Sequence, residues 1–218
     1  HKADVVHIRR GTPLPPRSSI VSPEDPAVPF LDISAICANI RAHAPWKALV
    51  PIIDGTAYLP LPPITFSEEK LFMDLESLIG AIDAPVRVGI NNVAQIRWAK
   101  AHPEVSCFAD IYLYMTNRRA CSLLLDEIPE PAGAYRWMER EHQDTNSWPL
   151  VVTDPMQGKR KLTPPLFISR ACYRYDALHL PCEGCPRRGS WTVTQSGRTY
   201  RVLVRDCVTM LLEEPEQH

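Results

Sequence analysis

The chain has 218 residues, 45% of them hydrophobic, and a formal net charge of −1. This length predicts one domain of ordinary size, or one domain with a small appendage, with enough apolar residues for a sizeable core. It contains no apolar run of the roughly 18 residues that a membrane helix needs, which argues against a membrane-spanning protein or a membrane partner.

The predicted elements of the first half alternate between strands and helices. Residues 11–29 hold six prolines and read as an extended, irregular lead-in. The clearest helix begins at Ser67, a good N-cap, and continues through an apolar face that ends at Ile79. In chain order, we expect a short strand at 5–8, a helix at 31–43, a buried strand at 48–53, a proline-punctuated loop at 59–63, the Ser67 helix, and a strand at 85–90.

The same alternation continues to the last third of the chain. Asn91 or Asn92 caps the next helix, and Asn117 starts another one that Pro129 and Pro131 end. The remaining expected elements are a helix at 93–102, a strand at 108–114, a helix at 117–124, a helical piece at 134–142, and core strands at 150–153 and 166–169.

Strands that alternate with helices predict βα units and a mainly parallel sheet. Five or six strands are too few to close an eight-stranded barrel. We therefore predict an α/β fold with a βα-repeat scaffold, either an open sheet or a partial or modified TIM-barrel-like sheet that a partner domain or subunit completes. The expected division is a lead-in at 1–30, a βα-repeat domain at 31–170, and a C-terminal four-cysteine β-hairpin module at 171–218.

The C-terminal module carries the strongest chemical signal. A β-hairpin is predicted from strands at 191–194 and 199–204, with a Gly-containing turn between them. Folding about residues 196 and 197 places Cys207 beside Cys185, so the hairpin returns a distant cysteine to the Cys182-Glu-Gly-Cys185 motif. With Cys172, four thiols converge at the spacing C-x9-C-x2-C-x21-C.

Four thiolates in this arrangement suit a metal centre. Structural zinc sites use short Cys-x-x-Cys pairs in tetrahedral geometry, and iron–sulfur clusters use four thiolates with more variable spacing. The competing interpretation is a set of free thiols that pack as small hydrophobic side chains. Metal binding to such a module contributes on the order of 10–16 kcal/mol, which exceeds what a small hairpin gains from burial.

The seven cysteines also indicate a compartment. Cys37, Cys107 and Cys121 fall on apolar helical or strand positions and are expected in the core. An odd count with a metal-like cluster argues for a reducing environment, so we expect the cytoplasm. The start, His1-Lys-Ala-Asp, contains no signal segment and no initiator Met, and we expect a complete protein or a fragment of a longer one.

Basic residues surround the cysteines. Residues 159–205 have a local charge of +8, whereas residues 1–158 sum to −5 and residues 206–218 to −4. A basic surface beside a metal site can hold phosphate, an acidic small molecule or RNA, and the alternative is a solvated face that compensates a tetrathiolate centre. The candidate anion-binding or substrate-binding residues are Arg170, Arg174, Arg187 and Arg188.

Other candidate residues are weaker. His179 lies between two of the cysteines and is either a metal ligand or a surface residue of the loop. Asp110 and Asn117 lie near the end of a predicted parallel strand, where α/β proteins bind ligands, but capping and turn roles fit them equally. No nucleophile elbow, zinc-protease motif or phosphate-binding glycine loop occurs, and no catalytic residue can be assigned.

The segment Pro165-Leu-Phe-Ile-Ser-Arg-Ala-Cys172, the Cys-x-x-Cys motif and the hairpin that ends in Asp206-Cys207 together resemble the C-terminal portion of the peptidase U32 (collagenase-like) family. The stretches Val88-Gly-Ile-Asn-Asn92 and Phe108-Ala-Asp-Ile-Tyr-Leu-Tyr-Met-Thr-Asn117 look like that family's barrel strands. The resemblance covers roughly residues 60 to 210.

This resemblance implies a (βα)-barrel-type fold and, in several branches, a 4Fe–4S cluster on Cys172, Cys182, Cys185 and Cys207. Despite the peptidase name, such branches act in oxygen-independent hydroxylation of RNA or of quinone precursors. We therefore expect an iron–sulfur-dependent hydroxylase-type enzyme or an accessory subunit of one. The alternatives are a non-enzymatic module, stabilised by Zn²⁺, that binds nucleic acid or a protein, and the disfavoured peptidase.

Overall fold

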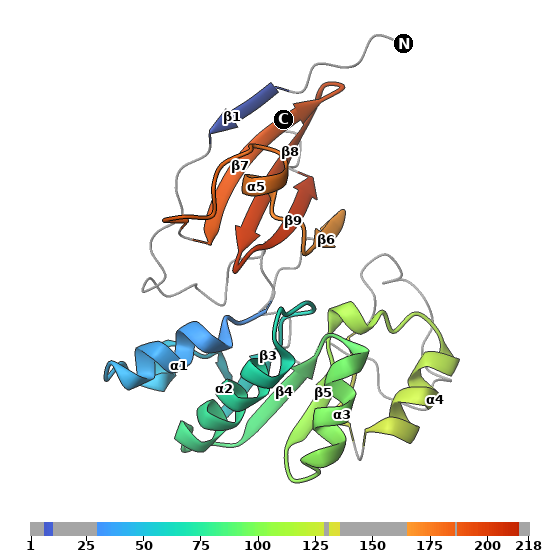
Figure 1. Cartoon of the computed structure of the whole chain (residues 1–218). Helices are drawn as coiled ribbons and strands as arrows, with labels where there is room; N and C mark the ends of the chain where they lie inside the picture. The colour runs from blue at the N-terminus through green and yellow to red at the C-terminus, as the bar shows by residue number, and fades with distance from the viewer. Residues whose placement is uncertain (1–6, 11–29, 129–130, 136–164, 186, 214–218) are drawn as a thin grey trace. The chain divides into compact units, whose positions relative to one another are not determined.

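The structure is a computed structural model, and it describes residues 7–10, 30–128, 131–135, 165–185 and 187–213. The chain divides into two compact units (Figure 1). Residues 20–162 form the first, which we call the α/β unit, and residues 1–19 and 163–218 form the second, which we call the β unit. This division differs from the linear scheme of lead-in, repeat domain and C-terminal module, because the two ends of the chain share one unit.

The α/β unit contains a four-stranded sheet in the order β2-β3-β4-β5. β2 (Ile52–Ile53) runs antiparallel to β3 (Thr56–Pro60), and β3, β4 (Val86–Ile90) and β5 (Ser106–Ala109) run parallel. An isolated parallel bridge joins Ala109 to Ala134 beyond β5. The predicted α/β class with a parallel sheet is confirmed, and the strands of the described residues do not close into a barrel.

Polar N-caps begin the helices of this unit. The side chains of Asp32, Ser67, Asn92 and Asn117 each accept a hydrogen bond from a backbone N–H in the first turn, which satisfies a donor that the helix itself leaves unpaired. Asn92 belongs to a full capping box with Gln95. The helices are α1 (Ile33–Arg41), α2 (Glu68–Ala81), α3 (Val93–Ala101) and α4 (Arg118–Glu127), with 3₁₀ turns η1 (Trp46–Ala48) and η2 (Ile111–Leu113).

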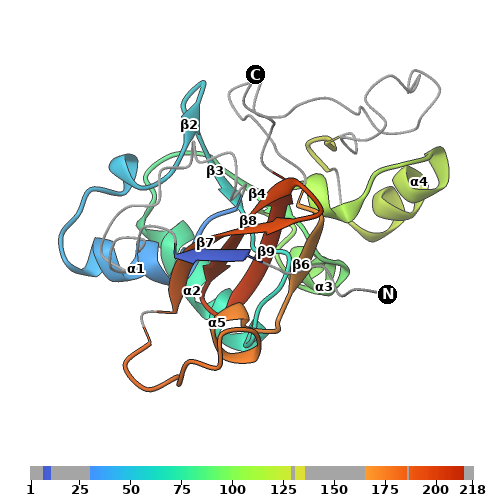
Figure 2. The ribbon, with the colours of Figure 1, turned by 90° about the horizontal axis from the view of Figure 1, so that it is seen from above.

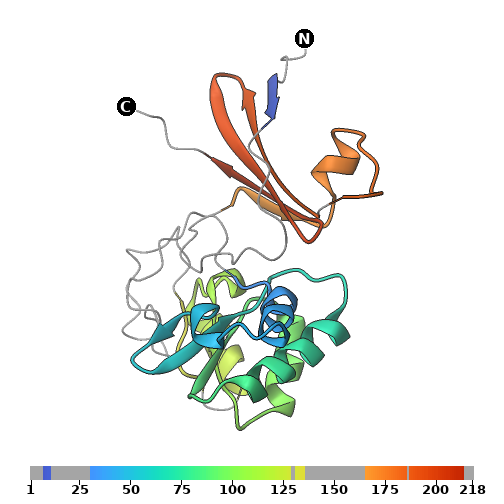
Figure 3. The ribbon, with the colours of Figure 1, turned by 90° about the vertical axis from the view of Figure 1, so that its left-hand side faces the viewer.

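All four helices pack on one face of the sheet. Alternate strand residues such as Leu59, Val88 and Cys107 join the apolar faces of the helices in one buried cluster. Figure 3 shows α1, α2 and α3 on the same side of the strands. The opposite face carries an aromatic layer, in which the ring of Phe108 lies 5.9 Å from that of Tyr58 and 6.1 Å from that of Tyr135. The helices share one face of the sheet because each βα unit adds its strand beside the previous one, in the same direction along the sheet.

Two of the expected strands of this unit are wrong in extent. The buried strand expected at 48–53 shrinks to β2, because Asp54 and Gly55 both have positive φ and form a tight hairpin turn. The parallel strand β3 was not expected, and it includes Leu59 and Pro60 of the loop expected at 59–63, with Pro60 tolerated at its last position. The strand expected at 108–114 ends at Ala109, since the carboxylate of Asp110 accepts a hydrogen bond from the Ile111 N–H and starts η2.

The β unit is a five-stranded antiparallel sheet in the order β1-β7-β8-β9-β6 (Figure 2). Its N-terminal edge strand pairs His7 with Thr194, so residues from opposite ends of the chain lie side by side. A single short helix, α5, packs near β8. The elements are β1 (His7–Arg10), β6 (Phe167–Ser169), α5 (Tyr173–Asp176), β7 (Arg188–Gln195), β8 (Arg198–Arg205) and β9 (Val208–Glu213).

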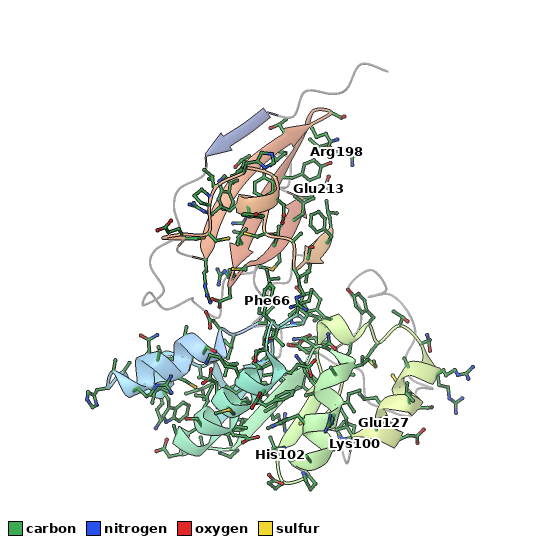
Figure 4. All side chains as sticks on the ribbon, in the orientation of Figure 1. Phe66, Lys100, His102, Glu127, Arg198 and Glu213 are labelled. Atoms are coloured by element: carbon green, nitrogen blue, oxygen red, sulfur yellow. The ribbon has the colours of Figure 1, made fainter. Side chains whose placement is uncertain are left out.

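The predicted hairpin turn is confirmed in its position. Gln195 pairs with Arg198, and Ser196 and Gly197 between them both have positive φ, as a type I′ turn requires. Near this turn Arg198 and Glu213 form an exposed ion pair of 3.7 Å (Figure 4). The final strand β9 was missed in the sequence, because no glycine marks the turn before it.

The strand at 166–169 lies in a different sheet from the one expected. It is β6, which pairs with β9 through Phe167 and Leu211 in the antiparallel sheet of the β unit rather than in the parallel sheet. Its apolar residues predict a strand of the core, yet the Phe167 side chain is 49% exposed at the edge of the sheet. The helical piece expected at 134–142 begins with Ala134 in a parallel bridge, and the rest of it, with the strand expected at 150–153, lies outside the described residues.

Candidate metal centre

The Cys182-Glu-Gly-Cys185 segment forms a tight turn. The Cys185 N–H donates to the Cys182 carbonyl at 3.0 Å, and Gly184 adopts φ +63°, which glycine allows without strain. The N–H of Arg187 donates to the Cys185 sulfur at 3.4 Å. Hydrogen bonds to sulfur tune bound clusters, so this turn is suited to present a ligand.

Cys207 lies in a second tight turn. Arg205 pairs with Val208, which leaves Asp206 and Cys207 as a two-residue loop between β8 and β9. Their φ angles are +46° and +65°. The described pairing of β7 with β8 ends at Arg188 and Arg205, two residues before Cys207, so the approach of Cys207 to Cys185 stays a prediction. A non-glycine residue held in the left-handed region costs about 1 kcal/mol or more, so Cys207 occupies a position that glycine would fill more easily.

Cys172 is held by the neighbouring strand. It precedes α5, and its carbonyl accepts the N–H groups of Tyr175 at 2.9 Å and Asp176 at 2.8 Å. The buried hydroxyl of Thr209 on β9 donates to the Ala171 carbonyl at 2.6 Å and accepts from the Tyr173 N–H at 3.0 Å. Thr209 therefore fixes the backbone on both sides of Cys172, a role that sequence reasoning missed because β9 itself was missed.

Electrostatics connect three of the four thiols. Burial raises the pKa of Cys207, the thiols of Cys172 and Cys185 raise it further, and the Arg187 guanidinium acts in the opposite direction. All seven cysteines are free thiols, and in the part of the chain that the structure describes no three His, Cys, Asp or Glu side chains gather closely enough to hold a metal ion. The four-cysteine site stays a prediction.

The basic candidates do not form one group. Arg170 and Arg187 are exposed, and Arg174 on α5 is half-buried. The backbone of Arg188 pairs with that of Arg205 across β7 and β8. Among the described residues, the β unit has nine arginines against four carboxylates, a net +5. The predicted excess of positive charge is therefore present on the described residues of the β unit, while the ligand that this charge would bind stays a prediction.

The remaining sulfur and imidazole candidates are separate from this site. Cys37, Cys107 and Cys121 lie buried in the core of the α/β unit, as predicted. Burial raises the pKa of each of these thiols, to about 12 for Cys107. His179 is exposed, with φ +51°, in the loop that leads to Cys182.

A buried polar network joins the carboxyl ends of the parallel strands. Asn91 donates to the Leu61 carbonyl at 2.7 Å and to the Asp110 carboxylate at 2.8 Å, and accepts from the Tyr112 N–H at 3.0 Å. Gln95 accepts from the N–H of Asn91 at 2.8 Å. These bonds tie the ends of β3, β4 and β5 together and give Asp110 a structural role.

Glycine makes room for that carboxylate. A Cβ atom on Gly89 would lie 2.9 Å from the Asp110 Oδ2 and 2.7 Å from the ring of Phe108. Asn117, the other polar residue singled out at a strand end, caps α4 by accepting from the Ala120 N–H at 2.9 Å. Both residues therefore have the capping and turn roles that the sequence left open.

Comparisons with known proteins add no identification: no family model, no curated protein and no solved structure matches the chain. Within the described residues, no helix has the length and apolar character needed to cross a membrane.

Proposed function

We propose that the β unit holds a metal centre on Cys172, Cys182, Cys185 and Cys207. The observation that carries the proposal is the backbone of Cys207 in the left-handed region. Among the described residues, three two-residue turns have positive φ at both positions, and the other two place glycine second, at Gly55 and Gly197. A demand for sulfur at this position would explain why a cysteine stands where the conformation favours glycine.

The surrounding residues fit an iron–sulfur cluster. Four thiolates carry such clusters, and their properties depend on hydrogen bonds to sulfur and on local charge. The Arg187 N–H supplies one such bond to Cys185, and the net positive charge of the β unit compensates the negative charge of a tetrathiolate. The likeness to the U32 family makes a 4Fe–4S cluster the first choice. When bound, it would supply electron transfer.

The α/β unit supports the corresponding enzyme class. β3, β4 and β5 follow in sequence order, and Ala134 extends the parallel series beyond β5. That order is the one in which βα barrels grow, so we propose that a partner domain or subunit completes a TIM-barrel-like sheet. The chain would then be a cytoplasmic enzyme, or an accessory subunit, for oxygen-independent hydroxylation of RNA or of an acidic small molecule. A peptidase remains disfavoured, because no nucleophile–base motif is present.

A second candidate rests on the charge of the β unit. Four protein ligands leave no open position on zinc, and nine arginines on one small unit suit a polyanion. In this alternative, Zn²⁺ stabilises a non-enzymatic module that binds nucleic acid or an acidic protein surface. Metal identity separates the two: a brown protein that absorbs at roughly 400 nm indicates a cluster, and a colourless protein with zinc supports the module.

The test exploits the conformation of Cys207. Cys207→Gly relieves backbone strain, so the metal-free chain should unfold at a higher denaturant concentration, with a gain of about 1 kcal/mol. The same variant should lose the metal, measured by elemental analysis of an anaerobic preparation. Stabilisation together with metal loss is the signature of a ligand placed against the preference of its turn.

Cys37→Ser is the matched control, since Cys37 is buried in the α/β unit and should not affect metal content. Full metal retention in Cys207→Gly, or equal loss in Cys37→Ser, would show that Cys207 is not a ligand.

A further inference from the structure

Beyond the ligands, we propose that the indole ring of Trp191 positions Cys172 and closes the apolar side of the four-cysteine site. The significance for a metal rests on the proposed function, whereas the packing of Cys172 on the cluster that contains Trp191 does not. Trp191 lies on β7, only 9% exposed, and forms a buried cluster with Val202 and Val204 of β8. Cys172 packs against this cluster.

The absence of a side chain at Gly189 sets the direction of the ring. A Cβ atom on Gly189 would lie 2.1 Å from Cη2 and 2.6 Å from Cζ3 of Trp191, so the indole lies directly over this glycine. Residues two apart on a strand share one face. The ring therefore points along β7 toward the end of the hairpin where Cys185 and Cys207 lie.

The ring of Tyr173 adds a second aromatic side chain beside Trp191. Its ring centroid lies 5.5 Å from that of Trp191, with the planes inclined by 54°. Thr209 donates to the Ala171 carbonyl and accepts from the Tyr173 N–H, which fixes the backbone on both sides of Cys172. Cys172 is thus held by hydrogen bonds along its backbone and by the aromatic cluster on which it packs.

An apolar wall of this kind has a definite consequence for a thiol site. The hydrophobic shell around a metal centre controls the access of solvent and the local dielectric. Trp191 acts here as a positioning residue: its ring would limit the approach of water, chelators and oxidants to Cys172. Displacing the ring should expose this thiol without changing the four ligands.

The decisive variant is Gly189→Ala, because the added methyl group occupies the place of the ring. Ser190→Ala is its matched control, since Ser190 is the next residue of β7 and faces the other side of the sheet. Both are made in the full chain. The metal is stripped, a thiol-alkylating reagent is added, and mass spectrometry follows the reaction of each cysteine separately.

We expect Cys172 to react about tenfold faster in Gly189→Ala, the factor that corresponds to about 1.4 kcal/mol of lost packing. In Ser190→Ala its rate should match the parent. The half-buried thiol of Cys207 reports unfolding of the β unit and should keep its parent rate, and the buried thiols of Cys37, Cys107 and Cys121 report unfolding of the α/β unit and should stay unreactive. An unchanged Cys172 rate in Gly189→Ala, or an equal increase in Ser190→Ala, overturns the inference.

Two further measurements keep the outcomes distinct. Trp191→Phe should raise the Cys172 rate as well, and combining it with Gly189→Ala should bring the rate back toward the parent, since the smaller ring leaves space for the methyl group. An additive increase in the double variant contradicts the proposed contact. Metal content of the untreated parent tests the metal centre separately, because the alkylation rates are measured without metal.

Discussion

The two units of this protein use the same tight turn with different residues, and the difference separates structural from chemical demands. In the α/β unit the turn after β2 has Asp54 and Gly55, so the residue with the most unusual φ is a glycine. In the β unit the turn after β8 has Asp206 and Cys207 in similar conformations. The first turn follows backbone preference, and the second departs from it at a cysteine.

The units also differ in what supports them. The α/β unit has an extensive apolar core beneath four helices, with capped helix ends and a buried amide network. Over the described residues it carries a net −3, from eight Lys or Arg and eleven Asp or Glu, against +5 for the β unit. One unit therefore gains its stability from burial, whereas we expect the other to depend in part on a bound metal.

Metal removal should give the largest effect and tests this contrast directly. Metal binding contributes on the order of 10–16 kcal/mol in small thiolate modules. A chelator should therefore lower hydrogen-exchange protection in β7, β8 and β9, whose sheet and buried cluster remain without metal, while α2 keeps its protection. Equal loss of protection in α2, or no change in β8, would remove the proposed difference between the units.

Asn91→Asp should give the next largest effect, and only in the α/β unit. It replaces the amide that donates to Asp110 with a second carboxylate at the same buried position. An uncompensated buried charge costs about 3–5 kcal/mol, so chemical unfolding should show a loss of that order at neutral pH. Metal content should match the parent. Asn117→Asp is a control that should change stability little, because Asn117 is exposed and an aspartate keeps the oxygen that accepts from the Ala120 N–H.

The smallest predicted effect concerns pH. Burial acts to raise the pKa of Asp74, but hydrogen bonds from Lys70 and Ser34, both 2.5 Å long, outweigh it and hold the pKa below its usual value. A lowered pKa stabilises the fold above the unfolded pKa, and this contribution disappears as the pH falls through the folded value.

Asp74→Asn should therefore remove about 1 kcal/mol at neutral pH and flatten the acid limb of the stability curve of the α/β unit. This is measured by denaturation between pH 2 and pH 7, a range that spans the usual carboxyl pKa of about 3.9. A parallel shift of the whole curve, with the acid limb unchanged in shape, would contradict the assigned role.

Local signals in the sequence were reliable where one residue controls the conformation. Ser67 and Asn117 begin helices as predicted, and Ser196-Gly197 forms the predicted turn. The sequence did not predict β3 and β9, because neither strand carries a clear local signal. β3 contains a proline, and β9 follows a turn without glycine. In each case tertiary pairing overrode the local preference, which a single sequence does not record.

The sequence by itself determined the α/β class, the hairpin turn at Ser196 and Gly197, and the burial of Cys37, Cys107 and Cys121. These features depend on periodicity and turn chemistry over short stretches. Only the tertiary structure decided that β1 and β6 join the hairpin in one sheet, that Thr209 holds the backbone around Cys172, and that Trp191 lies over Gly189. Those contacts join residues far apart in the chain or depend on the direction of a side chain, and neither leaves a periodic pattern.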